Sequence, residues 1–461
     1  MKRLVFCFDG TWNRLDSPHP TNVVIAAESV LPFSNEGVAQ AIFYDDGVGT
    51  GEHEHFSGGI FGTGLVKNLG DGYRFLIFNY TPGDQIYVFG FSRGAYTARS
   101  FVGLLNTCGI LLRKEAARVN EGIALYKQRE ASDAFREKMM RFRRDYSPAI
   151  CLSDAEHEWR LTNIAGYAQS PAPRLRVEYV DVWDTVGALG IPIRYAYLGW
   201  FNEKHQFHDT SLSAFVKSAR HAVAIDERRL DFRPTLWDNL DSLNEAAGKQ
   251  SADVDAPYQQ QWFPGVHSSV GGGGERRGLS DLALEWVLDG ARAAGLTLDG
   301  GAHSRIFELS PNYQEHLENS EDPGLLYRVM NRIAGADRLP GPQSLHEVSI
   351  AAKRRWLEKA ESLKDKVRYR PKTLDAVAPL LKDLTPEEFG LGDAGVSAPD
   401  IIDTYEVKRG DTLGRVAKKA YGAANEWQPI FEANRDKIDD PNRIYPGMLL
   451  RIPRRRGERR E

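Results

Sequence analysis

The chain of 461 residues is poor in cysteine, and this shortage excludes two classes of protein. Its three cysteines, Cys7, Cys108 and Cys151, form an odd and widely spaced set. Such a set fits neither a disulfide framework nor a zinc site. We expect the three to be small buried hydrophobic residues in a reducing compartment. The sequence predicts no metal ion and no cofactor.

Long apolar runs are missing as well. The apolar stretch at 4–8 is shorter than the hydrophobic region of a signal peptide, and no run approaches the length of a membrane-spanning helix. We therefore expect a protein that is cytoplasmic in the cell that makes it, and any export must use a route other than Sec. The net charge of −4 gives no electrostatic reason to expect a nucleic-acid partner.

The sequence does contain short apolar strands that alternate with helical segments. Strands are predicted at 4–8, 40–44, 85–91, 176–182 and 260–266. Helices are predicted at 67–80 and 95–105, a loop at 47–64, and an inserted helical stretch at 112–165. This alternation predicts an α/β fold, with a mostly parallel sheet flanked by helices and with helical insertions.

The strongest chemical motif is the segment 90–94, GFSRG, which matches the G-x-S-x-G nucleophile elbow. A predicted strand precedes it and a predicted helix follows it, as the sharp turn requires. Small residues flank the serine because the turn leaves no room for larger ones. We interpret Ser92 as the nucleophile. The alternative is a turn that merely tolerates glycine.

A serine nucleophile needs an imidazole to take its proton and a carboxylate to orient that imidazole. His267 directly follows a predicted core strand and enters a glycine run, so it is the first candidate for the base. A structural histidine in the glycine loop is the alternative, and His346 and His221 are reserves.

The carboxylate should lie between the serine and the histidine in sequence. Asp184 ends the strand after the elbow helix and is the first candidate. The alternative role for Asp184 is a cap on the following turn. Asp181 lies three residues earlier and should face the other side of the sheet. Asp226 and Asp281 stay open as alternatives.

The oxyanion hole of such an enzyme takes one backbone N–H from the residue after the nucleophile and one from an early strand–helix loop. Arg93 supplies the first, and Gly10 or Thr11 the second. The segment 9–11, DGT, also occurs in phosphatases with an aspartyl nucleophile. Those enzymes carry a second aspartate where this chain has Cys7, so that interpretation fails. The glycine-rich stretch 47–64 lacks the ending of a P-loop.

Six motifs occur in order: FCFDGTWN at 6–13, YDDGVGTG at 44–51, GFSRGAYTAR at 90–99, VDVWDTVGALG at 180–190, HAVAIDERR at 221–229 and WFPGVHSSVGGG at 262–273. Together they resemble the catalytic domain of the type VI secretion phospholipase effectors and related hydrolases, over roughly residues 1–350. The resemblance implies an α/β-hydrolase fold and hydrolysis of phospholipid esters. It places Ser92 at the family's nucleophile. One departure is Ser269, where family members often carry an acid.

Residues 189–201 are apolar and aromatic and follow Asp184, where hydrolase lids are commonly inserted. Aromatic residues such as Trp200 and Phe201 suit a membrane interface. We interpret them as substrate or lid residues. An inserted subdomain that packs on its own core is the alternative.

The C-terminal unit at 403–453 resembles a LysM domain, with the order strand, helix, helix, strand. The resemblance implies binding of glycans such as peptidoglycan, and a docking module for a protein is the alternative. We therefore predict a catalytic domain at 1–340, a helical connector at 341–402, a LysM-like domain at 403–453 and a basic tail at 454–461.

The predicted function is that of a serine ester hydrolase, a phospholipase and a secreted antibacterial effector. Its expected partners are a phospholipid or another ester substrate, peptidoglycan, secretion machinery and an immunity protein. Two alternatives stay open. One is an esterase of small or cell-wall-linked esters, and the other is an inactive scaffold that binds glycan or protein.

Overall fold

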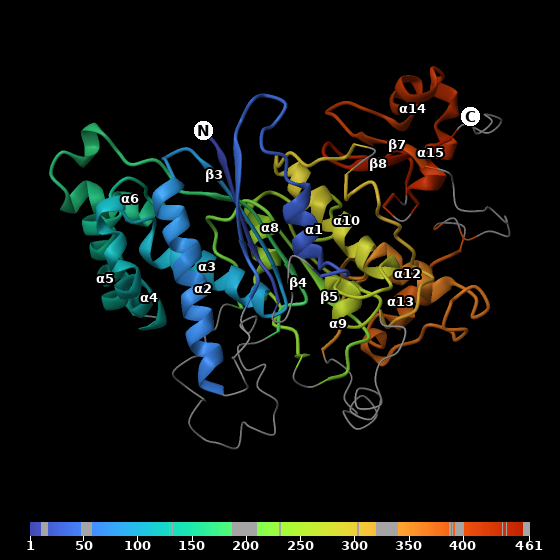
Figure 1. Ribbon diagram of the computed structural model, residues 1–461, viewed down its shortest axis with the longest axis horizontal. Helices are drawn as coiled ribbons and strands as arrows, with labels where there is room; N and C mark the ends of the chain where they lie inside the picture. Colours follow the sequence, from blue (N-terminus) through green and yellow to red (C-terminus); the bar gives the residue numbers. More distant parts are fainter. Residues whose placement is uncertain are drawn as a thin grey trace. The chain divides into compact units, whose positions relative to one another are not determined.

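A computed structural model describes residues 1–10, 17–47, 58–128, 130, 132–186, 210–229, 232–301, 304–319, 340–386, 389, 391, 401–435, 437–438 and 440–454. The chain divides into two compact units. The first comprises 1–16, 32–219 and 234–250. The second comprises 17–31, 220–233 and 251–461. Figure 1 shows the elements in chain order.

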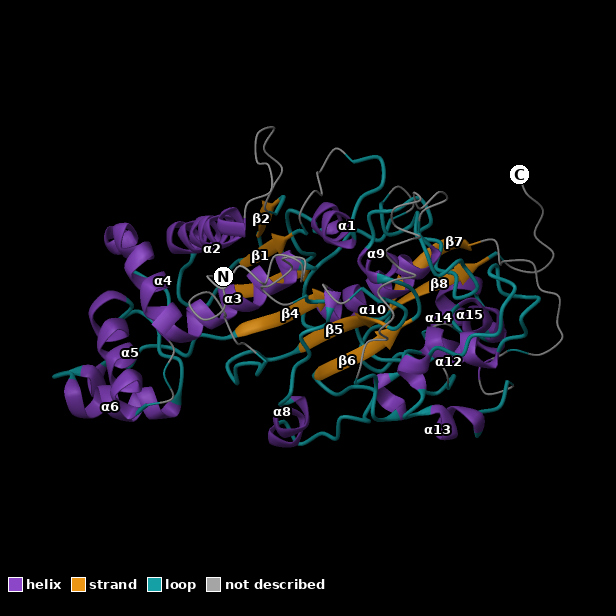
Figure 2. Cartoon of the chain, turned by 90° about the horizontal axis from the view of Figure 1, so that it is seen from below, coloured by secondary structure: helices purple, strands orange, loops and turns teal. Residues whose placement is uncertain are grey.

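The central feature is a six-stranded sheet with the order β2-β1-β3-β4-β5-β6 (Figure 2). Its strands are β1 (Arg3–Phe8), β2 (Gln40–Asp45), β3 (Gln85–Phe91), β4 (Val177–Trp183), β5 (Ala219–Ala224) and β6 (Tyr258–Phe263). The pairs β1–β2, β1–β3 and β3–β4 are parallel. The predicted α/β class and mostly parallel sheet are confirmed.

The helices of the first unit are α2 (Gly58–Asn79), α3 (Arg93–Cys108), α4 (Val119–Gln128), α5 (Asp133–Tyr146), α6 (Asp154–Asn163) and α8 (Leu240–Ala246). Helices α2 and α3 contact each other and β1. Five phenylalanines form the core between these helices and the strands: Phe6, Phe8, Phe43, Phe75 and Phe101. The rings of Phe6 and Phe101 are closest, with centroids 4.6 Å apart. Alternate residues of β1 thus fix α3, the helix that follows the elbow.

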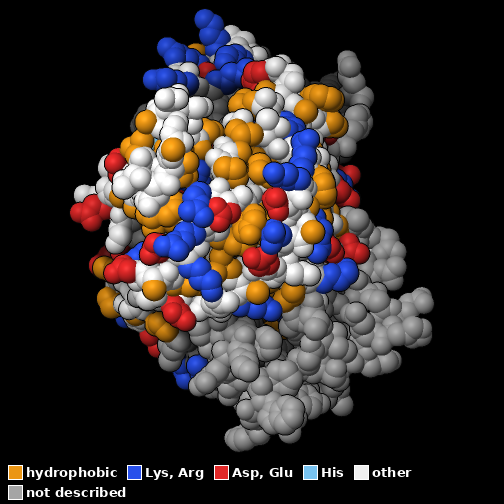
Figure 3. All heavy atoms as spheres, turned by 90° about the vertical axis from the view of Figure 1, so that its left-hand side faces the viewer, with side chains coloured by type: hydrophobic (Ala, Val, Ile, Leu, Met, Phe, Trp, Pro, Cys, Tyr) orange, Lys and Arg blue, Asp and Glu red, His pale blue; other side chains and the backbone are white. Residues whose placement is uncertain are grey.

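The inserted segment after α3 forms helices α4, α5 and α6, which lie beside α2 and α3 (Figure 1). Figure 3 views this side of the molecule and shows hydrophobic, basic and acidic side chains mixed over the face. Exposed ion pairs such as Arg136–Asp133 and Arg141–Glu137 join charges of opposite sign along α5. The insertion therefore offers interspersed charges there, and exposed pairs of this kind contribute little stability.

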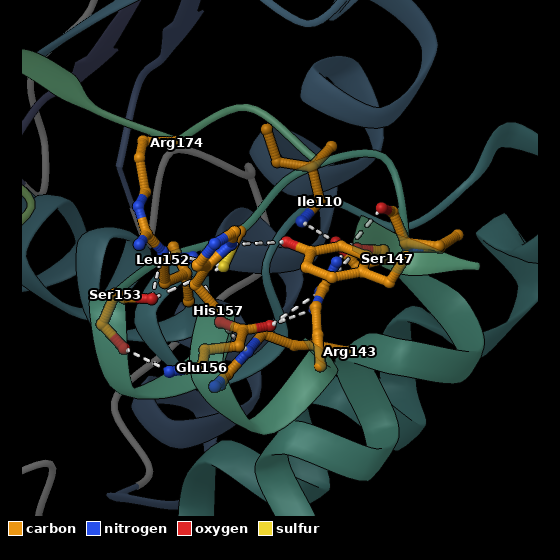
Figure 4. A network of polar contacts seen from close by, with 12 residues as sticks. Ile110, Arg143, Ser147, Leu152, Ser153, Glu156, His157 and Arg174 are labelled. Atoms are coloured by element: carbon orange, nitrogen blue, oxygen red, sulfur yellow. Dashed lines mark hydrogen bonds and ion pairs between the residues drawn. The ribbon is translucent and has the colours of Figure 1, made fainter. Parts of the chain in front are cut away.

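One buried carboxylate holds the insertion together (Figure 4). Glu156 on α6 lies 3.0 Å from Arg143 Nε on α5 and 2.6 Å from Arg160 Nη2. Its Oε2 also accepts the Leu152 N–H at 3.1 Å. Arg143 in turn donates to the Thr107 carbonyl at the end of α3, at 2.9 Å. All three charged side chains are buried, so removing the one anion would leave two buried cations without compensation.

We expect Glu156→Ala to lower the opening free energy of α5 and α6 by about 3–5 kcal/mol, the cost of breaking a buried ion pair from one side. Glu137→Ala is the matched control, because its exposed pair with Arg141 should contribute at most about 0.5 kcal/mol. Hydrogen exchange of the α5 and α6 amides measures both values. Equal protection in the two variants would contradict this account of the insertion.

The second unit contains β6, most of β5, and the helices α1 (Asn22–Ser29), α9 (His267–Gly271), α10 (Gly278–Ala293), α12 (Ile350–Leu357) and α13 (Ala378–Lys382). Helix α10 contacts α1 and α9. Phe263 on β6 packs on Trp286 of α10, with ring centroids 5.4 Å apart. The stretch predicted as a connector contributes buried apolar side chains to this unit, among them Trp356, Leu363, Leu374, Val377 and Leu381.

The C-terminal module has the predicted order, with β7 (Ile401–Glu406), α14 (Leu413–Tyr421), α15 (Gln428–Ala433) and β8 (Leu449–Pro453). Strands β7 and β8 pair antiparallel. The module contacts α10 of the same unit. Glu285 forms ion pairs with Arg451 and Lys437, and Asp289 accepts the Leu449 N–H at 3.1 Å.

The structure differs from the sequence-based expectation at two elements. The loop predicted to end at residue 64 ends earlier, because α2 begins at Gly58. Strand β5 was not predicted, because Arg220 and His221 interrupt its apolar pattern. Both polar side chains have partners: Arg220 lies over the Trp286 ring at 4.9 Å, and His221 Nδ1 lies 2.9 Å from Gln260 Oε1 on β6. The three cysteines are buried and not in disulfides, as expected.

Candidate active site

Ser92 lies in a strained turn between β3 and α3. Its backbone has φ 58° and ψ −120°, a conformation that L-residues other than glycine rarely adopt. Of the described residues other than glycine, only Ser92, Asp184 and Lys366 have a positive φ. Strain of this kind costs about 1–3 kcal/mol and persists where the surroundings enforce it, often at active sites. Strand, strained serine and helix in this order are the geometry of a nucleophile elbow.

The two flanking glycines are required by close packing. A Cβ on Gly90 would lie 2.7 Å from the Ala95 Cα. A Cβ on Gly94 would overlap the carbonyl oxygens of Phe8 and Asp9 at the end of β1. Neither position has room for a side chain, so the turn is pressed against the first strand. This is the physical reason for the glycine spacing seen in the sequence.

Asp184 lies beside Ser92 at the carboxyl edge of the sheet. Phe91 and Trp183 are register partners of β3 and β4, and the next residue of each strand is Ser92 and Asp184. The Ser92 N–H donates to the Trp183 carbonyl at 3.0 Å. Asp184 is fully buried and has φ 41°. Strands β3 and β4 therefore end at the same level of the sheet, and each is followed by a strained residue with a positive φ.

Two of the three predicted oxyanion-hole residues, Arg93 and Gly10, lie in the described part of the chain. Arg93 is the first residue of α3, where backbone N–H groups lack helical partners. Burial lowers the pKa of its side chain to about 10, which still leaves the guanidinium charged at neutral pH. The Gly10 N–H donates to Asp9 Oδ1 at 2.6 Å. It could face an oxyanion only after Asp9 turned away. Thr11 lies outside the described residues.

His267 belongs to the second unit, where it follows β6 as the first residue of α9. Its side chain is only 6% exposed. The His267 N–H donates to Glu227 Oε2 at 3.3 Å. The imidazole meets the Phe232 ring edge-on, with centroids 4.8 Å apart. Sequence reasoning gave neither Glu227 nor Phe232 a role, although Glu227 lies in the motif at 221–229, because their contacts with His267 join distant parts of the chain.

The reserve candidates have structural partners. His346 Nε2 lies 3.4 Å from Oγ of Ser344, the N-cap of the same short 3-10 helix. Asp226 accepts hydrogen bonds from the Gly265 N–H and the Tyr369 hydroxyl, at 2.7 and 2.8 Å. Asp281 accepts the Ser310 N–H at 2.8 Å and pairs with Arg277 at 3.0 Å. Loss of water around each carboxyl raises the pKa of Asp226 and of Asp281 to about 6.

With this geometry in place, the comparison with known families is decisive. The sequence profile of the type VI secretion phospholipase effectors, Tle1-like, catalytic domain, matches residues 2–290. The chain belongs to this family. A LysM profile matches residues 405–453, so the C-terminal module is a LysM domain.

Two curated relatives share parts of the chain. The uncharacterized protein YEL023C of Saccharomyces cerevisiae is 25% identical over 247 residues, which are 50% of this chain and 32% of the relative. The potassium binding protein Kbp of Escherichia coli O6:H1 is 53% identical over 49 residues, 11% of this chain and 33% of Kbp. The chain thus spans about a third of the length of each.

Two solved structures are similar at low identity. One is an uncharacterized protein from Pseudomonas aeruginosa, with TM-score 0.35 and 15% identity, covering 97% of this chain and 64% of that one. The other is the Tle1 effector bound to the VgrG spike of the type 6 secretion system, with TM-score 0.35 and 13% identity, covering 74% and 85%.

The predicted lid segment of this Tle1-like domain, 189–201 with Trp200 and Phe201, falls outside the described residues. Ser269, the departure from the family, donates its hydroxyl to the Leu317 carbonyl at 2.6 Å. In the described part of the chain, no group of three or more His, Cys, Asp or Glu residues could hold a metal ion. None of the described helices is long and apolar enough to cross a bilayer.

The backbone strain at Ser92 predicts an unusual effect of glycine on stability. Glycine accepts a positive φ without strain, so Ser92→Gly should be about 1–2 kcal/mol more stable than Ser92→Ala. Thermal unfolding of the two variants measures the difference. Ser100, in the helical interior of α3, is the control, because there the glycine variant should be the less stable by about 1 kcal/mol. The same sign at both positions would contradict a strained elbow.

Proposed function

We propose that the Tle1-like domain hydrolyses the carboxylic ester bonds of phospholipids, with Ser92 as nucleophile, His267 as base and Asp184 as the orienting carboxylate. The observation that carries the proposal is the positive φ of Ser92 between β3 and α3. That conformation presents the serine at the carboxyl edge of a parallel sheet, where an elbow exposes its nucleophile.

The proposed reaction has two halves. His267 takes the Ser92 proton while the oxygen attacks the ester carbonyl, and the Arg93 N–H stabilises the resulting oxyanion. The imidazolium then protonates the departing alcohol, which leaves an acyl group on Ser92. A water molecule, deprotonated by the same imidazole, attacks that acyl group and releases the fatty acid. Asp184 stabilises the imidazolium in both halves.

Asp184 suits this role because of its position and its burial. It leaves β4 at the level at which Ser92 leaves β3, as the register of the two strands requires. A fully buried carboxylate is strongly stabilised by a cationic partner, and the imidazolium formed during catalysis is such a partner. Asp226 and Asp281 accept the backbone N–H groups of Gly265 and Ser310, which gives each of them a structural role.

Support for a lipid substrate comes from the family, whose profile describes phospholipase effectors. A lid at 189–201, with Trp200 and Phe201 at the lipid surface, stays part of the proposal. So do delivery by the type VI apparatus to a target periplasm, an antibacterial role and a neutralising immunity protein. The whole chain would then be an effector that carries its own LysM domain.

Fatty-acid release from phospholipid vesicles tests the enzyme. We expect release by the wild-type protein, a loss of about 10⁴-fold or more in kcat with Ser92→Ala or His267→Gln, and a loss of about 10³–10⁴-fold with Asp184→Asn. Asp281→Asn is the matched control, since it makes the same change at another buried carboxyl and should leave kcat within a few-fold.

Other outcomes point to the alternatives. Cleavage of short soluble esters without release from vesicles would keep the serine mechanism and replace the phospholipase with an esterase. Inactivity on both substrates would favour the scaffold. Full activity of Asp184→Asn, together with an inactive Asp281→Asn or Asp226→Asn, would move the acid to another residue.

We also propose that the LysM domain binds peptidoglycan glycan strands, which would hold the enzyme near its substrate membrane. Support comes from the LysM match at 405–453. Kbp, the relative of this segment, is named for potassium binding, so potassium is the competing ligand for this chain.

Co-sedimentation with purified peptidoglycan tests this role. The full chain should pellet with it, and a variant that ends at residue 400 should stay in solution, with and without potassium. Equal sedimentation of the two proteins would contradict glycan binding by the module.

A further inference from the structure

The turn that carries His267 is held at both ends by two neighbouring carboxylates. Directly after β5, Asp226 Oδ2 accepts the Gly265 N–H at 2.7 Å, and Glu227 Oε2 accepts the His267 N–H at 3.3 Å. The Asp226 N–H returns a bond to the Gly265 carbonyl at 3.1 Å. We refer to residues 265–267 as the base turn. Its backbone on either side of Val266 is thus fixed from one adjacent segment.

Glu227 also acts on the imidazole. It forms a two-pronged pair with Arg229, with Nε–Oε1 at 2.8 Å and Nη2–Oε2 at 2.7 Å. The Arg229 guanidinium lies 3.8 Å from the centre of the Phe232 ring, and Phe232 meets the His267 ring edge-on at 4.8 Å. One buried carboxylate therefore fixes both the backbone of His267 and, through two stacked side chains, the orientation of its ring.

Tyr369 binds the same oxygen of Asp226 that accepts the Gly265 N–H. Its hydroxyl donates to Asp226 Oδ2 at 2.8 Å, and its side chain is buried. Nearby, Thr373 Oγ1 donates to the Ile225 carbonyl at 3.0 Å. Tyr369 and Thr373 lie well beyond residue 290, where the match to the catalytic family ends.

A second route joins the same C-terminal segment to the base turn. The Leu317 carbonyl accepts the Val266 N–H at 3.2 Å and the Ser269 hydroxyl at 2.6 Å. The Leu317 N–H in turn donates to Asp365 Oδ2 at 3.2 Å, and Asp365 pairs with the buried Arg355 at 2.5 Å. The residues from 355 to 373 thus reach the turn from two directions.

We propose that Glu227 and Tyr369 are positioning residues for His267, and that the segment 355–373 is therefore a working part of the catalytic unit. The inference rests on the proposed role of His267 as base. A base must stay within hydrogen-bond reach of the serine proton, and a misplacement of 1 Å costs about 10²-fold in rate. Polar clamps on both ends of the turn limit such misplacement.

The test compares single-group deletions by kcat, KM and amide exchange of the full-length protein. Tyr369→Phe removes one hydroxyl and should lower kcat about tenfold, with KM within twofold and faster exchange at residues 264–268. Glu227→Ala should lower kcat by about 10²-fold, since it releases both the backbone and the ring. Asp226→Asn keeps a carbonyl oxygen that accepts both bonds and should stay within threefold of wild type, whereas Asp226→Ala should resemble Tyr369→Phe.

Tyr313→Phe is the matched control. Its hydroxyl donates to Glu358 Oε2 at 2.8 Å in the same unit, without contact to the base turn, so kcat and exchange at 264–268 should not change. Wild-type kcat and exchange in both Tyr369→Phe and Glu227→Ala would overturn the inference. An equal loss in Tyr313→Phe would reduce it to a general effect on stability.

His267→Gln separates this inference from the proposed function. If that variant keeps full activity, His267 is not the base and the proposed function fails first. If His267→Gln is inactive while Tyr369→Phe and Glu227→Ala behave as wild type, the triad stands and only the positioning role is lost.

Discussion

The fold of the first unit depends on the sharp turn at Ser92, where the flanking positions have no room for a side chain. Gly90 packs against the start of α3, and Gly94 packs against the end of β1, so strand, turn and helix are locked to the first strand as well as to each other. The turn stores strain that a glycine would relieve. Stability alone favours glycine at this point, and the proposed role of Ser92 as nucleophile gives a reason for a serine.

The parallel sheet converts this local constraint into a site. Because β1, β3 and β4 are paired in parallel, their carboxyl ends meet at one edge. Ser92 and Asp184 directly follow β3 and β4, and Gly10 lies two residues after β1. The aromatic core packs β1 and β2 against α2 and α3. In the second unit, His267 depends on an equally dense arrangement, made of carboxylates after β5 and polar groups from a segment much later in the chain.

The LysM domain is fixed to this second unit by charge as well as by packing. Its β8 strand and the residues before it contact α10, where Glu285 pairs with Arg451 and Lys437 inside a largely buried interface. Helix α10 follows α9, the short helix that begins with His267. The module therefore belongs to the same compact unit as α10.

Much of this could be predicted from sequence because it depends on local patterns. The apolar runs of β1, β3 and β4 and the GFSRG segment have short-range signatures, so the fold class and the elbow were accessible. Strand β5 was not, because the partners of Arg220 and His221 lie on other elements. The engagement of the Gly10 N–H by Asp9 depends on a side-chain rotamer that no spacing encodes. Glu227 and Tyr369 were missed because their contacts join distant parts of the sequence. Glu227 contacts His267 across 40 positions, and Tyr369 contacts Asp226 across 143.

Covalent labelling of the hydroxyl tests whether Ser92 is the activated nucleophile that we propose. A fluorophosphonate reacts with an activated serine hydroxyl, which forms a bond to phosphorus as fluoride leaves. The account predicts that the full-length protein takes up one phosphonyl group, that peptide mass spectrometry places it on Ser92, and that His267→Gln strongly slows the labelling. Labelling at another residue, or no labelling of a folded protein, would contradict the account.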